Sequence, residues 1–260
     1  LDQGGDLAKG RKQAKQTFRS TFTNAYVAHA PMEPHAALAT FEGDRAVIRA
    51  STQSPFGLQR EAAELLGVPP DKVRVITPFV GGGFGGKSRN LQALEAVRLA
   101  RKAKRPVQVA WTRAEEFFHD SFRPAAVVTI DSGIDGGGRV TAWDFEVYFA
   151  GERGAPHGYA FDHHRTAVHG GGWRAPAGVH PFATGAWRAP GNNTNTFARE
   201  SQIDIMAAAA GVDPVEFRLR HLKEPRQIAV LKAAAERFGW KPAKGPSGRG
   251  FGVAVGTDAG

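Results

Sequence analysis

Five glycines around one phenylalanine form the segment of this sequence best suited to chemistry. They occupy Gly81–Gly86 and lead into Lys87 and Ser88. Backbone without Cβ atoms lets amide N–H groups approach an anionic ligand closely, so this glycine loop is predicted to bind one. A glycine-rich turn without a ligand is the alternative. It is disfavoured because each glycine loses extra conformational entropy on folding.

Residues 81–88 also satisfy the pattern G-x-x-x-x-G-K-[ST] of P-loop nucleotide-binding proteins. A P-loop ATPase or GTPase using Gly81–Ser88 is therefore the alternative function, with Val127–Asp131 as an apolar strand that ends in a Mg²⁺-binding aspartate. Two features argue against it. A P-loop sheet is parallel, whereas this strand leads through the turn Asp135–Gly138 into a second strand at 139–150, as in an antiparallel hairpin. Pro78 also interrupts the run into the loop.

Two other segments carry residues that could act beside the glycine loop. Gln53 lies in Ser51–Pro55, just before a predicted helix, and Arg188 lies on the Pro-Gly turn of Ala186–Gly191. Taken alone, the glutamine is typical of a solvated loop and the arginine of an ordinary turn. Trp173 and Trp187 are candidates for lining a substrate cavity, with packing as the alternative.

Together and in this order, the segments resemble the molybdenum-cofactor-binding subunit of the xanthine dehydrogenase/aldehyde oxidase family of molybdenum hydroxylases. Gly81–Lys87 resembles the family's G-G-G-F-G-G-K motif, Ser51–Gln53 its S-T-Q segment and Arg188–Gly191 its R-A-P-G turn. Tyr26 with His29–Pro34, and the paired helices around Asn195–Arg218, resemble further family segments. The resemblance covers most of residues 23–225.

Details of the motifs favour one branch of this family. The W-R-A-P-G form and the run Asn192–Asn195 are similar to the bacterial isoquinoline 1-oxidoreductase and nicotinate dehydrogenase branch. Ser88 stands where the better-known xanthine and aldehyde enzymes often carry an acidic residue. An aldehyde substrate therefore stays open beside an N-heteroaromatic one.

The resemblance implies a molybdenum-dependent oxidoreductase that hydroxylates aldehydes or N-heteroaromatics with water-derived oxygen. Gln53 would then polarise an oxo ligand, Phe84, Gly85 and Arg188 would shape the metal site, and Gly81, Gly82, Gly83 and Gly86 would cradle the pterin. The pterin itself holds the metal in this family, so no protein metal ligand is expected. The implied cofactors are molybdenum–molybdopterin, with a cytosine dinucleotide form as one alternative, and [2Fe–2S] clusters on a partner chain.

The resemblance also implies that a catalytic group lies elsewhere. The family's general-base glutamate follows a second glycine-rich cofactor segment, and neither is recognised in these residues. Glu33 and Glu200 are the carboxylates nearest the motifs, and we interpret Glu200 as structural because it falls inside a helix beside Arg199. We therefore expect a fragment that needs a missing C-terminal segment and an iron–sulfur subunit as partners.

Composition excludes several function classes. The 260 residues contain no cysteine, which removes disulfides, Cys nucleophiles and Cys-ligated iron–sulfur clusters from this chain. The formal charge is +9, but the basic residues are not interleaved with aromatic ones, which favours a solvated face over a nucleic-acid surface. No apolar run approaches the ~20 residues of a membrane span. The spacing of His157, His163, His164, His169 and His180 matches no usual zinc pattern, so we expect loop histidines there.

Periodicity and capping signals predict an α+β fold with mixed sheets. Ser54, Pro55 and Gly67 delimit a helix at 55–66, while Thr112 and Asp213 open short helices. Further predicted helices span 90–104, 195–210 and 226–238. Predicted strands span 23–30, 45–50, 71–77, 106–111, 125–131, 139–150 and 250–255.

These elements suggest three segments of the chain. Residues 1–22 are expected to form a polar surface segment, 23–225 a first cofactor-binding domain and 226–260 the start of a second one. The strand at 250–255 is expected to lack a partner strand in this chain.

Overall fold

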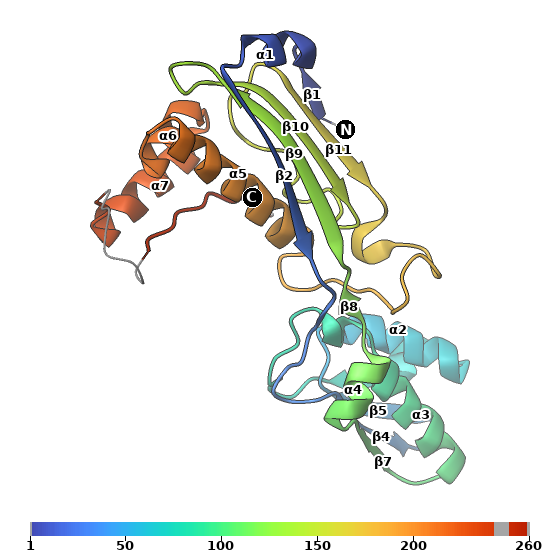
Figure 1. Ribbon diagram of the computed structural model, residues 1–260. Coiled ribbons are helices and arrows are strands. Elements are labelled where there is room, and N and C mark those ends of the chain that lie inside the picture. Colours follow the sequence, from blue (N-terminus) through green and yellow to red (C-terminus); the bar gives the residue numbers. More distant parts are fainter. Residues whose placement is uncertain (1, 242–249, 259–260) are drawn as a thin grey trace. The chain divides into compact units, whose positions relative to one another are not determined.

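A computed structural model describes residues 2–241 and 250–258 of the chain (Figure 1). The described residues form two compact units, each assembled from separate stretches of sequence. The main unit contains residues 1–25, 124–176 and 189–260, and the inserted unit contains residues 26–123 and 177–188. Both units combine a sheet with helices, which confirms the predicted α+β class.

A five-stranded mixed sheet forms the main unit. Its strand order is β1 (Asp2–Gly4), β11 (His164–His169), β10 (Val140–Tyr148), β9 (Ala126–Ile134) and β2 (Gln16–Asn24). Only the pair β10 and β11 is parallel. The predicted hairpin is confirmed, because β9 and β10 run antiparallel on either side of the Asp135–Gly138 turn. The short helix α1 (Leu7–Gln13) packs against both of these strands.

Three helices complete the main unit: α5 (Asn192–Ala209), α6 (Pro214–His221) and α7 (Pro225–Phe238). Asp213 caps α6 as predicted, because its carboxylate accepts from the Val215 and Glu216 amides. The core lies between the sheet and these helices, where Trp143 and Phe145 pack with Met206 and Phe217. A short 3₁₀ turn, η3, spans Gly172–Arg174.

The inserted unit is built on a four-stranded sheet with the order β6 (Val73–Ile76), β5 (Arg45–Ala50), β4 (Ala36–Glu42) and β7 (Val107–Ala110). The helices α2 (Pro55–Leu66) and α3 (Leu91–Ala103) share one apolar core with it, and α4 spans Arg113–His119. A two-stranded ribbon pairs β3 (Val27–Ala28) with β8 (Phe122–Arg123). The 3₁₀ turns η1 and η2 span Pro70–Lys72 and Gly86–Ser88.

Residues 1–22 are largely exposed, but they form regular structure that belongs to the main unit. They contain β1, α1 and most of β2, and β2 pairs with β9 along its whole length. Phe18 and Phe22 alternate with polar residues in β2 and pack against the core of the main unit. The sequence reading missed this strand because its residues are mostly polar, although exposed and half-buried positions alternate along it. The strand predicted at 23–30 corresponds to the end of β2 followed by β3.

The strand predicted at 250–255 is also wrong, because residues 250–258 contain no β-structure. Side chains bind the backbone of Val255 instead. The Val255 amide donates to Glu200 Oε2 at 2.9 Å, and Arg199 Nη2 donates to the Val255 carbonyl at 3.1 Å. Val253 and Val255 pack against the core of the main unit. The segment is therefore anchored by an ion cluster rather than by a neighbouring strand.

The two units do not follow the predicted segments. Neither begins at residue 23 or ends at residue 225, and α7 contributes Leu231 to the same core as α5 and α6. The contacts that define a unit join residues far apart in sequence, which no local signal reveals. Within the described residues, no helix is long and apolar enough to cross a membrane.

Candidate functional site

The glycine loop belongs to the inserted unit, between β6 and α3. Its backbone takes left-handed conformations at Gly82 (φ +94°), Phe84 (φ +53°) and Gly85 (φ +114°). For Phe84 this conformation costs on the order of 1 kcal/mol or more, and such strain tends to gather at functional sites. Phe84 is also 44% exposed, so burial of its ring does not explain the strained backbone.

Most of the glycines are required by other parts of this unit. A Cβ at Gly83 would overlap the Gln53 side chain, and one at Gly85 would overlap the Ala186 carbonyl. A Cβ at Gly86 would lie 2.6 Å from Asp120 Oδ2 and 2.9 Å from the His29 ring. The bare backbone therefore lets four distant parts of the sequence close on the loop, a role that the sequence alone did not suggest.

Gln53 is held against the loop by its carbonyl group. Its Oε1 accepts from the Gly85 amide at 2.9 Å, and its own backbone amide donates to the Lys87 carbonyl at 2.8 Å. The opposite end of the side chain, Nε2, has no hydrogen-bond partner in the part of the chain that the structure describes. Gln53 is exposed, so the geometry leaves an oriented N–H donor available to a ligand.

Lys87, the lysine of the P-loop pattern, is fully buried and already paired. Its Nζ donates to Glu33 Oε2 at 2.6 Å and to the Glu33 carbonyl at 2.8 Å. Partial burial would raise the pKa of Glu33, but the hydrogen bonds from Lys87 and the Gly81 amide lower it. A P-loop lysine must reach a phosphate, and this ammonium cannot. With the antiparallel pairing of β9 and β10, this argues against the nucleotide-binding alternative.

The turn that contains Trp187 and Arg188 also reaches the glycine loop. The Arg188 amide donates to the Phe84 carbonyl at 2.8 Å, and the side chain of Arg188 is exposed. Trp187 is half-buried and lies under the Arg123 guanidinium, whose carbon is 5.3 Å from the ring centroid. Trp173, by contrast, is part of the main unit, where the Arg174 guanidinium lies over it.

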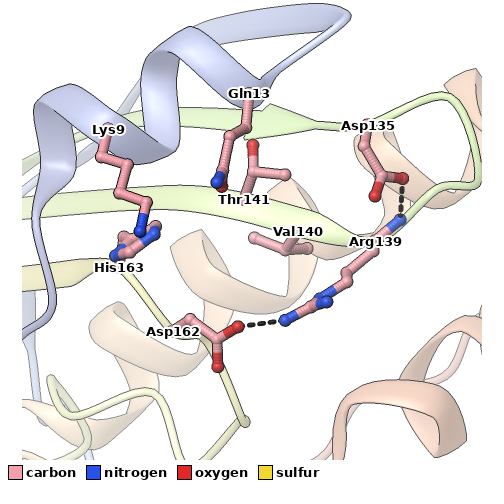
Figure 2. A pocket seen from close by; sticks show the side chains of 8 residues that line it. All are labelled: Lys9, Gln13, Asp135, Arg139, Val140, Thr141, Asp162 and His163. Atoms are coloured by element: carbon pink, nitrogen blue, oxygen red, sulfur yellow. Dashed lines mark hydrogen bonds and ion pairs between the residues drawn. The ribbon is translucent and has the colours of Figure 1, made fainter.

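A cavity of about 620 Å³ lies in the main unit and contains none of the motif residues. Figure 2 shows its charged lining, in which the Arg139 guanidinium pairs with Asp162 and the Arg139 amide donates to Asp135. Lys9 of α1 and His163, which follows Asp162, also line it. Of its charged groups, Arg139 and Asp162 already form an ion pair. It offers no assembled catalytic group.

Hydrogen bonding accounts for the two clusters of possible metal ligands. In Asp2, His157 and His164, the His157 Nδ1 atom accepts from the Tyr159 amide at 3.1 Å, which places the ring proton on Nε2. Burial lowers the pKa of His157 to about 4, so this ring is neutral. A metal-binding histidine normally donates through its second nitrogen, and His157 accepts there. The cluster of His35, Glu116 and Asp120 is a buried network in which His29 and Arg113 also take part.

Glu200 is structural, as predicted. It is buried and accepts from the Tyr159 hydroxyl, the Val255 amide and the guanidiniums of Arg199 and Arg218. Every lone-pair direction of this carboxylate is therefore used. It has no capacity left to take a proton from a substrate.

Comparison with known proteins places this architecture in a family. The model of the molybdopterin cofactor-binding domain matches residues 2–173. A nicotinate dehydrogenase subunit of Pseudomonas putida is 31% identical over 98% of this chain and 24% of its own length. The molybdenum-binding subunit PaoC of aldehyde oxidoreductase from Escherichia coli K12 is 32% identical over 97% of this chain and 38% of its own length.

Solved structures share the fold. Quinoline 2-oxidoreductase from Pseudomonas putida 86 superposes with a TM-score of 0.76 and 22% identity, over 90% of this chain and 34% of that one. Aldehyde oxidoreductase from Desulfovibrio gigas gives a TM-score of 0.75 with 19% identity, over 91% of this chain and 29% of that one. The chain thus spans about a quarter to two fifths of the length of these relatives. The three motifs, the fold and the match over residues 2–173 together show that the chain belongs to the molybdopterin cofactor-binding domain family, among the molybdenum-binding subunits of the xanthine dehydrogenase type.

Proposed function

We propose that this chain is the molybdopterin-binding part of a molybdenum hydroxylase, and that Gln53, Phe84 and Arg188 face the reacting end of the cofactor. One observation carries the proposal. Two segments far apart in sequence meet at the glycine loop and form a set of three with it, because Gln53 accepts from the Gly85 amide and the Arg188 amide donates to the Phe84 carbonyl. The same three segments form the motif set of the family.

The residues present fit such a cofactor. The amides of Gly82, Gly83 and Phe84 have no partner among the described residues, and Gln53 Nε2 is a fourth donor beside them. Consecutive free amides with alternating backbone handedness suit the anionic groups of a pterin. The exposed Arg188 adds a positive charge next to the loop. We assign Gly81, Gly82, Gly83, Phe84, Gly85 and Gly86 to cofactor binding.

When bound, the molybdenum–pterin group supplies the two-electron oxidation, and the protein supplies position and polarity. Gln53 donates a hydrogen bond toward the reacting end, while its anchored carbonyl group keeps the amide from rotating. Glu33 and Glu200 are not assigned as the general base, because Lys87 occupies one and four donors occupy the other. The base, a [2Fe–2S] partner and the remaining segment of the subunit are assigned to other parts of the assembly.

Aldehydes or N-heteroaromatics are the proposed substrates, with water-derived oxygen. The names of the relatives support both classes, since one is part of an aldehyde oxidoreductase and another is part of a nicotinate dehydrogenase. Trp187 is the candidate for contacting the substrate, because it lies next to Arg188 on the turn that binds the loop. A cytosine dinucleotide form of the pterin is the proposed variant for a bacterial enzyme of this branch.

A comparison of two Gln53 variants in the complete enzyme tests this proposal. Gln53→Glu keeps an acceptor for the Gly85 amide but removes the N–H donor, whereas Gln53→Ala removes both. Turnover should fall in both by on the order of 10–1,000-fold, the range for a positioned electrostatic donor or less. Molybdenum and pterin content should stay near wild type in Gln53→Glu and should fall below it in Gln53→Ala.

Gln108→Glu is the matched control, because it makes the same chemical change at an exposed position of β7. It should leave turnover and cofactor content unchanged. Wild-type turnover in Gln53→Glu would remove Gln53 from the reacting end. Purified enzyme that binds ATP with Mg²⁺ and contains no molybdenum would instead favour the P-loop alternative.

A further inference from the structure

His29 is a buried histidine whose two ring nitrogens both face hydrogen-bond acceptors. Its Nδ1 lies 3.1 Å from Asp120 Oδ2, and its Nε2 lies 2.9 Å from the Ala186 carbonyl oxygen. The His29 side chain is completely inaccessible to solvent, and that of Asp120 is nearly so. All three residues belong to the inserted unit.

The partners determine the protonation state of this ring. A carbonyl oxygen can only accept, and an ionised carboxylate can only accept. Asp120 Oδ1 already accepts from the Ser121 amide at 2.7 Å, which leaves Oδ2 for His29. Both ring nitrogens must therefore donate, and a ring that donates twice is an imidazolium cation.

The surrounding charges agree with a cation at this position. Glu116 faces the same network and accepts from His35 Nδ1 at 2.9 Å and from the Arg113 guanidinium. Arg113 thus neutralises Glu116, and the second buried carboxylate, Asp120, needs a positive partner of its own. An unpaired charge in this environment would be costly, because burial removes its hydration. An imidazolium at His29 satisfies Asp120.

Two glycines lie directly on this pair. The positions of hypothetical Cβ atoms show that Gly86 lies against the His29 ring and Asp120 Oδ2, and that Gly85 lies against the Ala186 carbonyl that His29 holds. The Arg188 amide, two residues after Ala186, binds the Phe84 carbonyl at 2.8 Å. The histidine therefore stands at the point where the glycine loop and the turn meet.

We propose that His29 is a buried imidazolium that, with Asp120, clamps the turn at 183–188 onto the glycine loop and so positions Phe84 and Arg188. Its significance for cofactor binding rests on the proposed function, but the clamp itself does not. His29 is thus a positioning residue. If its ring loses a proton, one nitrogen turns a lone pair toward an acceptor and the clamp opens.

The clamp should respond to pH in one direction. Burial disfavours the charged ring, but the hydrogen bonds and charge of Asp120 and the Ala186 carbonyl outweigh it and raise the pKa of His29 above 6.5. Burial also opposes ionisation of Asp120, yet the bond and charge of His29 lower the pKa of that carboxyl below 3.8. The contribution of His29 is therefore complete below about pH 6.5 and is lost as the pH rises through its raised pKa.

Replacing Asp120 by asparagine tests how many protons the His29 ring carries. The introduced side chain would keep a carbonyl oxygen for the Ser121 amide and place an NH₂ group against His29 Nδ1. A neutral ring with its proton on Nε2 then satisfies both partners, so Asp120→Asn should keep the clamp and remove its pH dependence. His29→Ala should open the clamp at every pH.

Two measurements, each made on the cofactor-free and the cofactor-loaded protein, report the protonation of His29 and the state of the clamp. Nitrogen chemical shifts of His29 should show both nitrogens protonated near neutral pH in the wild type and one in Asp120→Asn. The exchange protection of the Arg188 amide, corrected for the intrinsic pH effect, should fall at least about tenfold in His29→Ala and in alkaline wild type. In Asp120→Asn it should stay within about twofold of its neutral value.

Asp44→Asn is the matched control, because it removes a carboxylate from an exposed pair with Lys72 in the same unit. It should alter neither measurement. A neutral His29 in the wild type near neutral pH would overturn the proposal even if Asp120→Asn fails to fold. A protonated His29 in a protein that never binds molybdenum would leave the clamp intact and reject the proposed function instead.

Discussion

Lys87 is a cation that the fold removes entirely from water, with Glu33 as its carboxylate partner. Glu33→Gln should therefore lower the free energy of unfolding of the inserted unit by roughly 1–3 kcal/mol. The loss should stay below that of a fully buried pair, because the Glu33 side chain is 36% exposed and partly screened. Denaturant unfolding, followed by a signal from the inserted unit, measures this change in the free energy of unfolding.

The same pair predicts a pH response. Hydrogen bonds from Lys87 and the Gly81 amide lower the pKa of Glu33 below its usual 4.5, against the effect of burial. The stabilisation is therefore present above about pH 4.5 and is lost as the pH falls through the lowered pKa. Glu33→Gln should flatten this acid response. An unchanged acid response would show that Glu33 and Lys87 do not pair in solution.

At the scale of single elements, two helix starts that look alike in sequence differ in the structure. Thr112 caps α4 with a complete capping box, in which its Oγ1 accepts from the Glu115 amide and the Glu115 carboxylate accepts from the Thr112 amide. Ser54 occupies the N-cap position of α2 but makes no side-chain capping bond. Thr52 Oγ1 accepts from the Ser54 amide instead.

Alanine substitutions should separate these two caps. Thr112→Ala should destabilise the inserted unit by about 1 kcal/mol, the usual value of a lost N-cap. Ser54→Ala should change its stability by less than about 0.5 kcal/mol, because no capping bond is lost. Denaturation midpoints of the two variants, measured side by side, decide the matter. Equal losses would show that Ser54 caps α2 in solution.

At the scale of the whole molecule, buried histidines should give the two units different responses to mild acid. In the main unit, burial lowers the pKa of His157 to about 4 and also lowers that of His221. Each ring is neutral when folded and gains a proton on unfolding, so stability is complete above about pH 6.5 and falls below it. His29 of the inserted unit has a raised pKa, so its contribution is already complete at pH 6.5 and does not change as the pH falls further.

Acidification to about pH 5 should therefore cost the main unit roughly 2 kcal/mol through His157 alone and spare the inserted unit. The carboxyl groups with lowered pKa values in the inserted unit do not titrate until lower pH. Hydrogen-exchange protection of β10 and β5 amides would report the two units separately. His157→Gln should weaken the response of β10, whereas His169→Gln, at a 44% exposed site, should not. A main unit that gains protection on acidification would contradict this prediction.

Local sequence signals determined much of the secondary structure. The helix at 55–66 was predicted with its exact limits because Pro55 and the left-handed Gly67 are short-range start and stop signals. The hairpin of β9 and β10 followed from alternation around a glycine turn. The motif order around Gln53, the glycine loop and Arg188 likewise pointed to the molybdopterin-binding family, which the match over residues 2–173 shows. All these signals lie within a few residues of the elements they specify.

Only the tertiary structure decided which groups those motifs meet. Lys87 is paired rather than free because Glu33, 54 residues away, reaches it, and His29 faces Ala186 across 157 residues. The backbone of Val255 binds Glu200 and Arg199 rather than a neighbouring strand. A buried charge or backbone group must find a partner, but many residues of the right type were available along the chain. The partner is chosen by packing across the whole fold, and packing at that range leaves no local pattern in the sequence.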